Sequence, residues 1–120
     1  MAEEDAQQLM MNLITNAIRA ASENSANRKP NDRGLVSVDL QVKDGLVQFS
    51  VTDNGAGPQD QIAETIFEPF VTGSKEGTGL GLSLVKAISN RANGDVHWRR
   101  ENHMTTFCFE SGNKQVVEAG

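Results

Sequence analysis

The chain has 120 residues, of which 38% are hydrophobic and 22% are charged, and its formal net charge at pH 7 is −5. These values predict one soluble globular domain and exclude an intrinsically disordered chain. The acidic balance argues against a nucleic-acid partner, and no apolar run reaches the ~20 residues that a membrane helix needs.

The first predicted element is a helix over residues 6–22, because apolar residues recur there at helical spacing. Its expected inward stripe consists of Met10, Leu13, Ile14, Ala17, Ile18 and Ala21. Residues 23–34 are rich in Asn, Ser, Pro and Gly, which predicts a loop.

A β-hairpin is predicted next, because apolar and polar residues alternate on both sides of Asp44-Gly45, a type I′ turn signal. The alternation predicts that each strand buries one face. The inward residues are Val36, Val38, Leu40 and Val42 on the first strand, and Val47, Phe49 and Val51 on the second.

The second half of the chain predicts two further helices and two further strands. A short helix is expected over 59–67, after Pro58, and a loop over 70–79. A longer helix is expected from about 80 to 92, with Asn93-Gly94 at its end. Its inward residues are Leu84, Val85, Ile88 and Ala92.

One strand is expected around Val96 and Trp98, and another over 104–109 with Phe107 and Phe109 on one face. The order of elements predicts an α+β domain over 1–110, with helices on one face of the sheet, followed by a polar tail over 111–120.

Asn12, Asn16 and Arg19 recur at i, i+4 and i+7 on the first helix, roughly opposite its apolar stripe. Asn is a mediocre residue for a helix interior, so its repetition favours a binding face for a cation and a phosphate. A solvated face is the alternative.

Asp53 continues the inward alternation of the second strand and precedes two glycines, Gly55 and Gly57. A carboxylate at the edge of the core can accept a hydrogen bond from an exocyclic amine, and the glycines allow a flat ligand to approach the backbone. A turn-initiating Asp is the alternative.

Gly77-Thr78-Gly79-Leu80-Gly81-Leu82 begins the later helix, where bare backbone amides can bind an anion; a flexible loop entry is the alternative. Phe67-Glu68-Pro69-Phe70 precedes it, and its two Phe are expected to be core or loop anchors. Thr72, Ser74 and Lys75 lie between these motifs, where Lys75 is within reach of a phosphate or merely solvated.

His97 and His103 have no nearby sequence partner that would make either one a nucleophile or a metal ligand, and we interpret both as having neither role. Cys108 is the only cysteine, which excludes an internal disulfide and a zinc site built from cysteines, and suits a reducing compartment.

Taken together and in this order, the motifs resemble the ATP-binding catalytic domain of bacterial sensor histidine kinases, a branch of the GHKL superfamily with the Bergerat fold. Residues 12–19 look like the N box, 53–57 like the first glycine box, 67–70 like the F box and 77–82 like the second glycine box. The amino-acid sequence of residues 67–75 looks most like that of the nitrogen-regulation branch of these kinases.

This resemblance implies a two-layer sandwich with a mostly antiparallel mixed sheet and about three helices on one face. The family usually has a strand and a helix before the N box, where this chain has only a few residues. We therefore expect either an N-terminally trimmed fragment of the fold or a sheet with an exposed edge.

The resemblance also implies roles for matching positions. Asn12, Asn16 and Arg19 would be catalytic, with Asn16 holding Mg²⁺ and Arg19, in place of the usual Lys, contacting phosphate. Asp53 would accept from the adenine amino group. The remaining residues implied to bind ATP are Gly55, Gly57, Phe70, Thr72, Ser74, Lys75, Gly77, Thr78, Gly79, Leu80, Gly81 and Thr105.

The implied function is transfer of the ATP γ-phosphoryl group to a histidine on a separate dimerisation and phosphoacceptor domain, with a response regulator downstream. We expect a cytoplasmic, monomeric domain that binds ATP but does not phosphorylate itself, and that contacts neither nucleic acid nor membrane. The alternatives are an anti-sigma-factor-type serine kinase and a catalytically inactive docking module.

Overall fold

The computed structural model describes residues 2–23, 33–70 and 80–111, and these form an α+β domain in two layers. Four strands make one antiparallel sheet in the order β1-β2-β4-β3, and all three pairings are antiparallel. The elements are α1 (Glu3–Glu23), β1 (Val36–Lys43), β2 (Leu46–Asp53), the 3₁₀ helix η2 (Ala63–Thr65), α2 (Gly81–Arg91), β3 (Asp95–Glu101) and β4 (Met104–Glu110).

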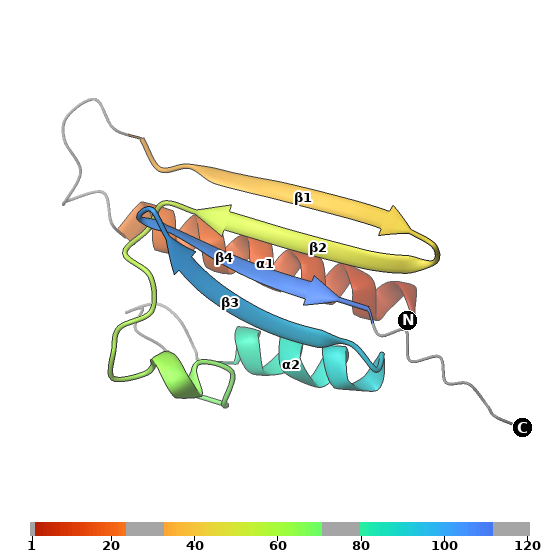
Figure 1. Ribbon diagram of the computed structural model, residues 1–120. Helices are drawn as coiled ribbons and strands as arrows, with labels where there is room; N and C mark the ends of the chain where they lie inside the picture. Colours follow the sequence, from red (N-terminus) through yellow and green to blue (C-terminus); the bar gives the residue numbers. More distant parts are fainter. Residues whose placement is uncertain (1, 24–32, 71–79, 112–120) are drawn as a thin grey trace, which may run out of the picture.

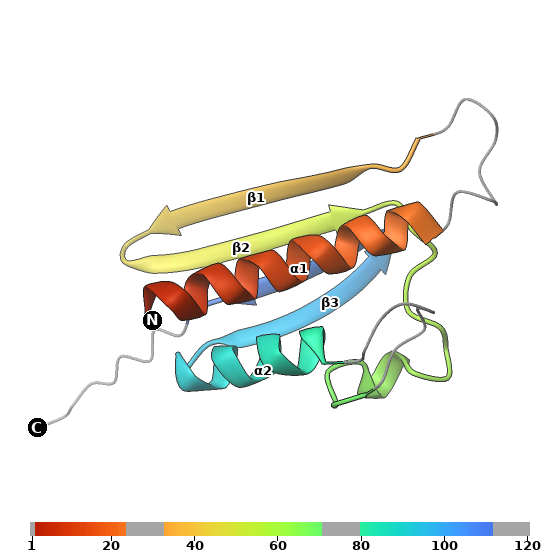
Figure 2. The same cartoon turned by 180° about the vertical axis from the view of Figure 1, so that it is seen from behind.

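Both α-helices cover the same face of the sheet, as the two opposite views in Figures 1 and 2 show. The core lies between these layers, and it is built from α1, α2, β2, β4 and one residue of β3. Its buried members are Leu9, Leu13, Ala17, Phe49, Val51, Val85, Ile88, Val96, Phe107 and Phe109. The predicted α+β fold class is therefore confirmed. The described residues differ from the expectation in having two α-helices and one 3₁₀ helix instead of about three helices, and in pairing their strands only antiparallel. None of the helices in the described part of the chain is long and apolar enough to cross a membrane.

The first helix is longer than predicted at its N-terminal end, and its buried face is rotated. Three acidic residues stand in its first turn, where the positive end of the helix dipole favours them. Leu9 is buried, whereas Ile18 is 53% exposed, so the prediction that Ile18 points inward is wrong. The reason is that the sheet and α2 meet α1 along the line of Leu9, Leu13 and Ala17.

The hairpin has the predicted turn. Asp44 and Gly45 both have positive φ, of 53° and 79°, which is the backbone of a type I′ turn, and Lys43 pairs with Leu46 across it.

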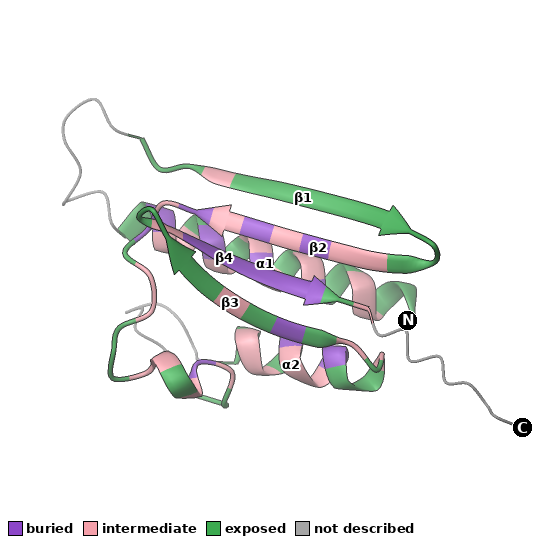
Figure 3. Ribbon diagram, in the orientation of Figure 1, coloured by how far each residue is buried: buried purple, intermediate pink, exposed green. Residues whose placement is uncertain are grey.

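The prediction that the first strand buries one face is wrong. β1 is the sheet edge, and Figure 3 shows it exposed along nearly its whole length. Val38, Leu40 and Val42 are 49%, 56% and 66% exposed, because α1 packs mainly over β2. The expected exposed sheet edge is thus present.

The expected helix over 59–67 is only the single turn of η2. Pro58 and Pro69 lie on either side of this segment, and only Ala63–Thr65 between them is helical. Ile66 is nevertheless buried, and the Phe67 ring packs edge-on against Phe107 with 6.0 Å between ring centroids. These two side chains hold the segment against the core.

The second helix ends as predicted. The Gly94 N–H donates to the carbonyl oxygen of Ser89 at 2.8 Å, and Asn93 has a φ of 57°. Val85 and Ile88 are buried as expected, whereas Leu84 is 37% exposed. Residues 24–32, 71–79 and 112–120 lie outside the described residues, so the loops and the tail predicted there stay predictions.

Candidate functional site

Two buried polar side chains lie next to each other at one end of the sheet, on the face that carries the helices. Asp53 is the last residue of β2 and pairs in register with Thr105 of β4. Both continue the inward alternation of Val51 and Phe107, and each is only 1% exposed. They place a hydrogen-bond acceptor and a hydroxyl side by side at the edge of the core.

Arg100 of β3 extends this row across the sheet, although it was not among the residues predicted from the sequence. It pairs in register with Thr105. Its Nη1 donates to Thr105 Oγ1 at 2.6 Å and to the carbonyl oxygen of Gly55 at 3.0 Å. The alternation of Val96 and Trp98 along the strand predicts that Arg100 lies on the same face of the sheet as these two residues, so this signal could have identified it from the sequence.

The electrostatics of Asp53 reflect its burial. Loss of contact with water raises the pKa of the Asp53 carboxyl above its ordinary value. Two interactions oppose this rise: the Gly55 N–H donates to Asp53 Oδ1 at 2.8 Å, and the Arg100 charge lies nearby. The residue is therefore a buried acceptor that its neighbours help to keep ionised.

Gly55 connects this row to α1. A Cβ at this position would lie 2.6 Å from the carbonyl oxygen of Ala20, so the glycine is required by the close approach of the helix backbone. This packing contact is a structural reason for Gly55 that differs from the predicted approach of a flat ligand. Gly57 has a φ of +83°, which favours glycine, and it lies against the Arg100 side chain.

The polar face of α1 lies beside the buried stripe rather than opposite it. The buried face of α1 contains Leu9 and does not contain Ile18. This rotation leaves three polar residues half-buried instead of fully solvated: Asn12, Asn16 and Arg19. The side-chain nitrogen of Asn12 is buried and has no hydrogen-bond partner within the described part of the chain. A buried donor of this kind calls for an acceptor from a ligand or a water molecule. This observation favours the binding interpretation over the solvated face.

The geometry of α1 places its polar face near the row on the sheet. Asn16 precedes Ala20 by four residues, so the two lie one above the other on the helix. Because Ala20 contacts Gly55, the turn that contains Asn16 is adjacent to the place where the chain leaves β2.

The start of α2 lies at the end of the molecule where β2 ends (Figures 1 and 2). Leu80 precedes the helix, and no side chain in the described residues caps its first turn, which contains no acidic group. A Cβ on Gly81 would meet nothing within 4 Å, so the helix tip is open on that side. Backbone amides at such a tip can bind an anion.

The two Phe of the 67–70 motif differ. Phe67 is a core anchor, as predicted, whereas Phe70 is 76% exposed and has a φ of 67°. The remaining predicted binding residues lie outside the described residues: Thr72, Ser74, Lys75, Gly77, Thr78 and Gly79.

Comparisons with known proteins agree with this arrangement. Residues 1–114 match the family model described as histidine kinase-, DNA gyrase B- and HSP90-like ATPase. An uncharacterised sensor-like histidine kinase of Rhizobium meliloti is 39% identical over 100 residues, which cover 78% of this chain and 17% of that protein. The sensory histidine kinase/phosphatase NtrB of Rhodobacter capsulatus is 39% identical over 94 residues, which cover 72% of this chain and 26% of that protein.

Among solved structures, full-length ShkA in complex with AMPPNP superposes with a TM-score of 0.70 at 30% identity, over 89% of this chain and 21% of that one. The chain thus spans only about a sixth to a quarter of the length of these relatives.

Proposed function

Because the chain belongs to the family of histidine kinase-, DNA gyrase B- and HSP90-like ATPases, we propose that it is the ATP-binding catalytic domain of a two-component sensor histidine kinase. The observation that carries this proposal is the pair of buried polar residues Asp53 and Thr105, with the exposed Arg100 hydrogen-bonded to Thr105 and the pair joined to α1 through Gly55. The kinase names of the relatives favour it over a serine kinase or an inactive docking module.

The row has the hydrogen-bonding pattern that an aminopurine requires. When it is ionised, the Asp53 carboxylate can only accept, so in that form it suits the exocyclic amine of adenine. Arg100 donates to the Thr105 oxygen, which leaves the Thr105 proton to be donated to a ring nitrogen or to a bridging water. Guanine carries an oxygen where adenine carries its exocyclic amine. That oxygen would face the Asp53 carboxylate, and two acceptors cannot form a hydrogen bond with each other.

The residues on the helices suit a polyphosphate. The buried Asn12 nitrogen is a donor without a partner in the described residues, and Arg19 is a half-buried cation on the same helix face. Asn16 offers an amide oxygen, the ligand type that Mg²⁺ prefers, and when bound this ion neutralises phosphate charge.

The second glycine box and the segment before it complete the proposed site. Gly77, Thr78, Gly79, Leu80 and Gly81 would border the phosphates at the tip of α2. Phe70, Thr72, Ser74 and Lys75 would belong to a lid that orders around the nucleotide.

In the proposed reaction, the bond between the γ-phosphorus and the ADP oxygen breaks, and a phosphorus–nitrogen bond to an acceptor imidazole forms. The domain contributes position and charge neutralisation, whereas the acceptor histidine lies on a dimerisation domain. A response regulator would then receive the phosphoryl group. The NtrB relative supports the proposal that the whole protein belongs to the nitrogen-regulation branch.

Calorimetry with AMPPNP, with and without Mg²⁺, tests the site. Asp53→Ala should abolish binding, because it removes the buried acceptor. Asn16→Ala should retain binding without Mg²⁺ and lose the increase in affinity that Mg²⁺ causes.

Asp39→Ala on exposed β1 and Thr15→Ala on the exposed side of α1 are matched controls that should bind as wild type. An equal loss of Mg²⁺-free binding in both site variants, or no binding by the wild type, would contradict the proposal.

A further inference from the structure

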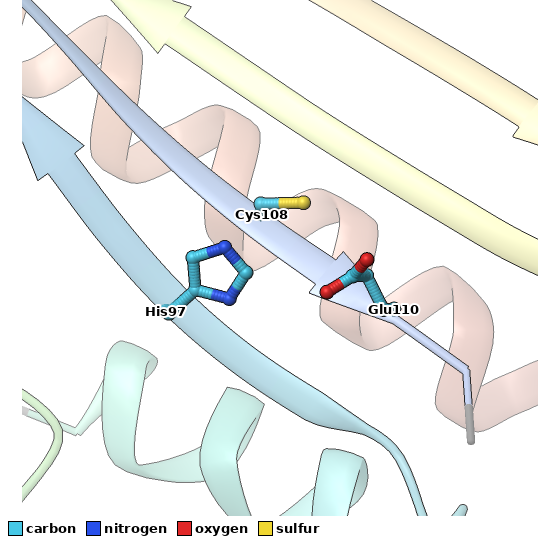
Figure 4. A group of neighbouring side chains, drawn as sticks. All are labelled: His97, Cys108 and Glu110. Atoms are coloured by element: carbon cyan, nitrogen blue, oxygen red, sulfur yellow. The ribbon is translucent and has the colours of Figure 1, made fainter.

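A second group of chemically reactive side chains lies on the opposite face of the sheet, away from the helices. His97 of β3 and Cys108 and Glu110 of β4 each offer one ligand atom, and these three atoms all lie within 4.8 Å of one another. Figure 4 shows the three side chains gathered over the two strands. His97 thus has neighbours in space that its sequence context did not indicate.

The strand register is what brings these side chains together. His97 and Cys108 are directly opposite each other in the antiparallel β3–β4 pairing. Glu110 follows Cys108 by two residues and therefore lies on the same face. Phe107 and Phe109 point to the other face, into the core. The cluster is thus set by the backbone pairing of the sheet.

The cluster has one buried member and two exposed members. The Cys108 side chain is 2% exposed, whereas His97 and Glu110 are both exposed. The described contacts of the sulfur are long, at 3.7 Å to Gln48 Nε2 and 4.0 Å to the carbonyl oxygen of Phe109. An ion can reach this place from solvent, and the imidazole and the carboxylate can adjust to it.

Asp95 lies beside the imidazole of His97. Its Oδ2 lies 3.7 Å from His97 Nδ1, and the two residues are on the same face of β3. Metal-bound imidazoles usually donate their second ring N–H to a carboxylate. Rotation of the two exposed side chains would have to shorten this distance before Asp95 could accept from His97 in that way.

We propose that His97, Cys108 and Glu110 form a surface site for a borderline-soft divalent cation, with Zn²⁺ as the ion that fits best. Thiolate, imidazole and carboxylate are the three ligand types that Zn²⁺ takes, and three protein ligands leave a fourth tetrahedral position for water. Bond lengths of about 2.0–2.3 Å require the ligand atoms to move closer than they are now, which rotations of the exposed His97 and Glu110 allow.

The same donors discriminate against the ion proposed for the nucleotide site. A thiolate and an imidazole are poor ligands for Mg²⁺, which prefers oxygen and keeps its waters. The two sites also lie on opposite faces of the sheet, so the cation site does not depend on the proposed kinase function.

Titration of the full, untagged chain with Co²⁺ and then Zn²⁺ tests the proposal. Co²⁺ should produce a thiolate-to-metal charge-transfer band with a one-to-one endpoint, and Zn²⁺ should abolish the band by displacement. A large excess of Mg²⁺ should leave the band unchanged. Absence of the band, or its loss with Mg²⁺, would overturn the proposal.

The variants His97→Gln, Cys108→Ser and Glu110→Gln locate the site. Each should weaken Zn²⁺ binding by about tenfold or more, since changes even in outer partners of metal ligands have effects of that size. His103→Gln, in the β3–β4 turn, is the matched histidine control and should bind as wild type. His97 and Glu110 are exposed, so their variants report on binding even if Cys108→Ser disturbs the fold. The assignment would be overturned if His97→Gln and Glu110→Gln bound Zn²⁺ with wild-type affinity. It would also be overturned if His103→Gln lost as much Zn²⁺ affinity as they do.

Discussion

At the scale of single residues, the buried carboxylate of Asp53 combines its proposed binding role with a structural disadvantage. Burial is the largest influence on its pKa and raises it above the ordinary value of 3.8, so the unfolded chain releases this proton at lower pH than the native state. The contribution of Asp53 to stability therefore falls as pH rises from about 3.8 through the raised native pKa, and the loss persists at higher pH.

Asp53→Asn tests this disadvantage. The variant keeps an oxygen that can accept from the Gly55 N–H but removes the buried charge. We expect a higher free energy of unfolding than wild type at pH 7, and no difference below about pH 3.8, measured by urea denaturation. Affinity for AMPPNP should fall by about 100-fold, because a hydrogen bond to a charged group is lost. Asp39→Asn, on exposed β1, is the control without a burial effect, and an Asp53→Asn variant less stable than wild type at pH 7 would contradict the argument.

Arg100 offers a test of selectivity at the same scale. Without its donation, the Thr105 hydroxyl is free to accept as well as donate, so the site loses part of its preference for an amine beside Asp53. Arg100→Ala should weaken ATP binding about tenfold and lower the ratio of ATP to GTP affinity. Arg99→Ala is the matched control, because that side chain pairs with exposed Glu101. If the two variants show the same ratio, Arg100 does not orient Thr105.

At the scale of elements, the contact between α1 and the segment after β2 holds the site together. Gly55→Ala would put a Cβ against the backbone of Ala20, which can move only if α1 shifts. Overpacking of this kind destabilises by about 1–3 kcal/mol, so we expect both lower stability and weaker nucleotide binding.

Gly81→Ala is the contrasting change at the tip of α2. A Cβ there meets open space, and Ala is the better helix former, so stability should be unchanged or higher by up to about 1 kcal/mol. Thermal unfolding and AMPPNP calorimetry on both glycine variants separate the two effects. Equal destabilisation in Gly55→Ala and Gly81→Ala would show that the Ala20 contact is not a tight one.

At the scale of the whole molecule, we expect that neither histidine of the proposed kinase domain is its phosphoryl acceptor. His97 lies on the sheet face opposite Asp53 and Thr105, and His103 lies in the β3–β4 turn. We expect that the isolated chain, incubated with labelled ATP and Mg²⁺, carries no stable acid-labile label. Addition of a cognate dimerisation domain with its acceptor histidine should produce label on that partner. Acid-labile label on the isolated chain would refute this expectation.

Much of the fold follows from local patterns. The type I′ turn at Asp44-Gly45 and the end of α2 at Asn93-Gly94 depend on backbone conformations that a few adjacent residues dictate. Alternation along β2 was enough to place Asp53 on the inner face, because side-chain direction in a strand repeats every two residues.

Other features depend on contacts between segments far apart in the chain. Alternation looks the same on an edge strand as on a covered one, so only the position of α1 over β2 leaves β1 exposed. The pairing of β3 with β4 decides that Arg100 reaches Thr105 and that His97 meets Cys108. Register and layer packing join residues that no local pattern relates, and for that reason the row at the site and the cation cluster emerge only from the tertiary structure.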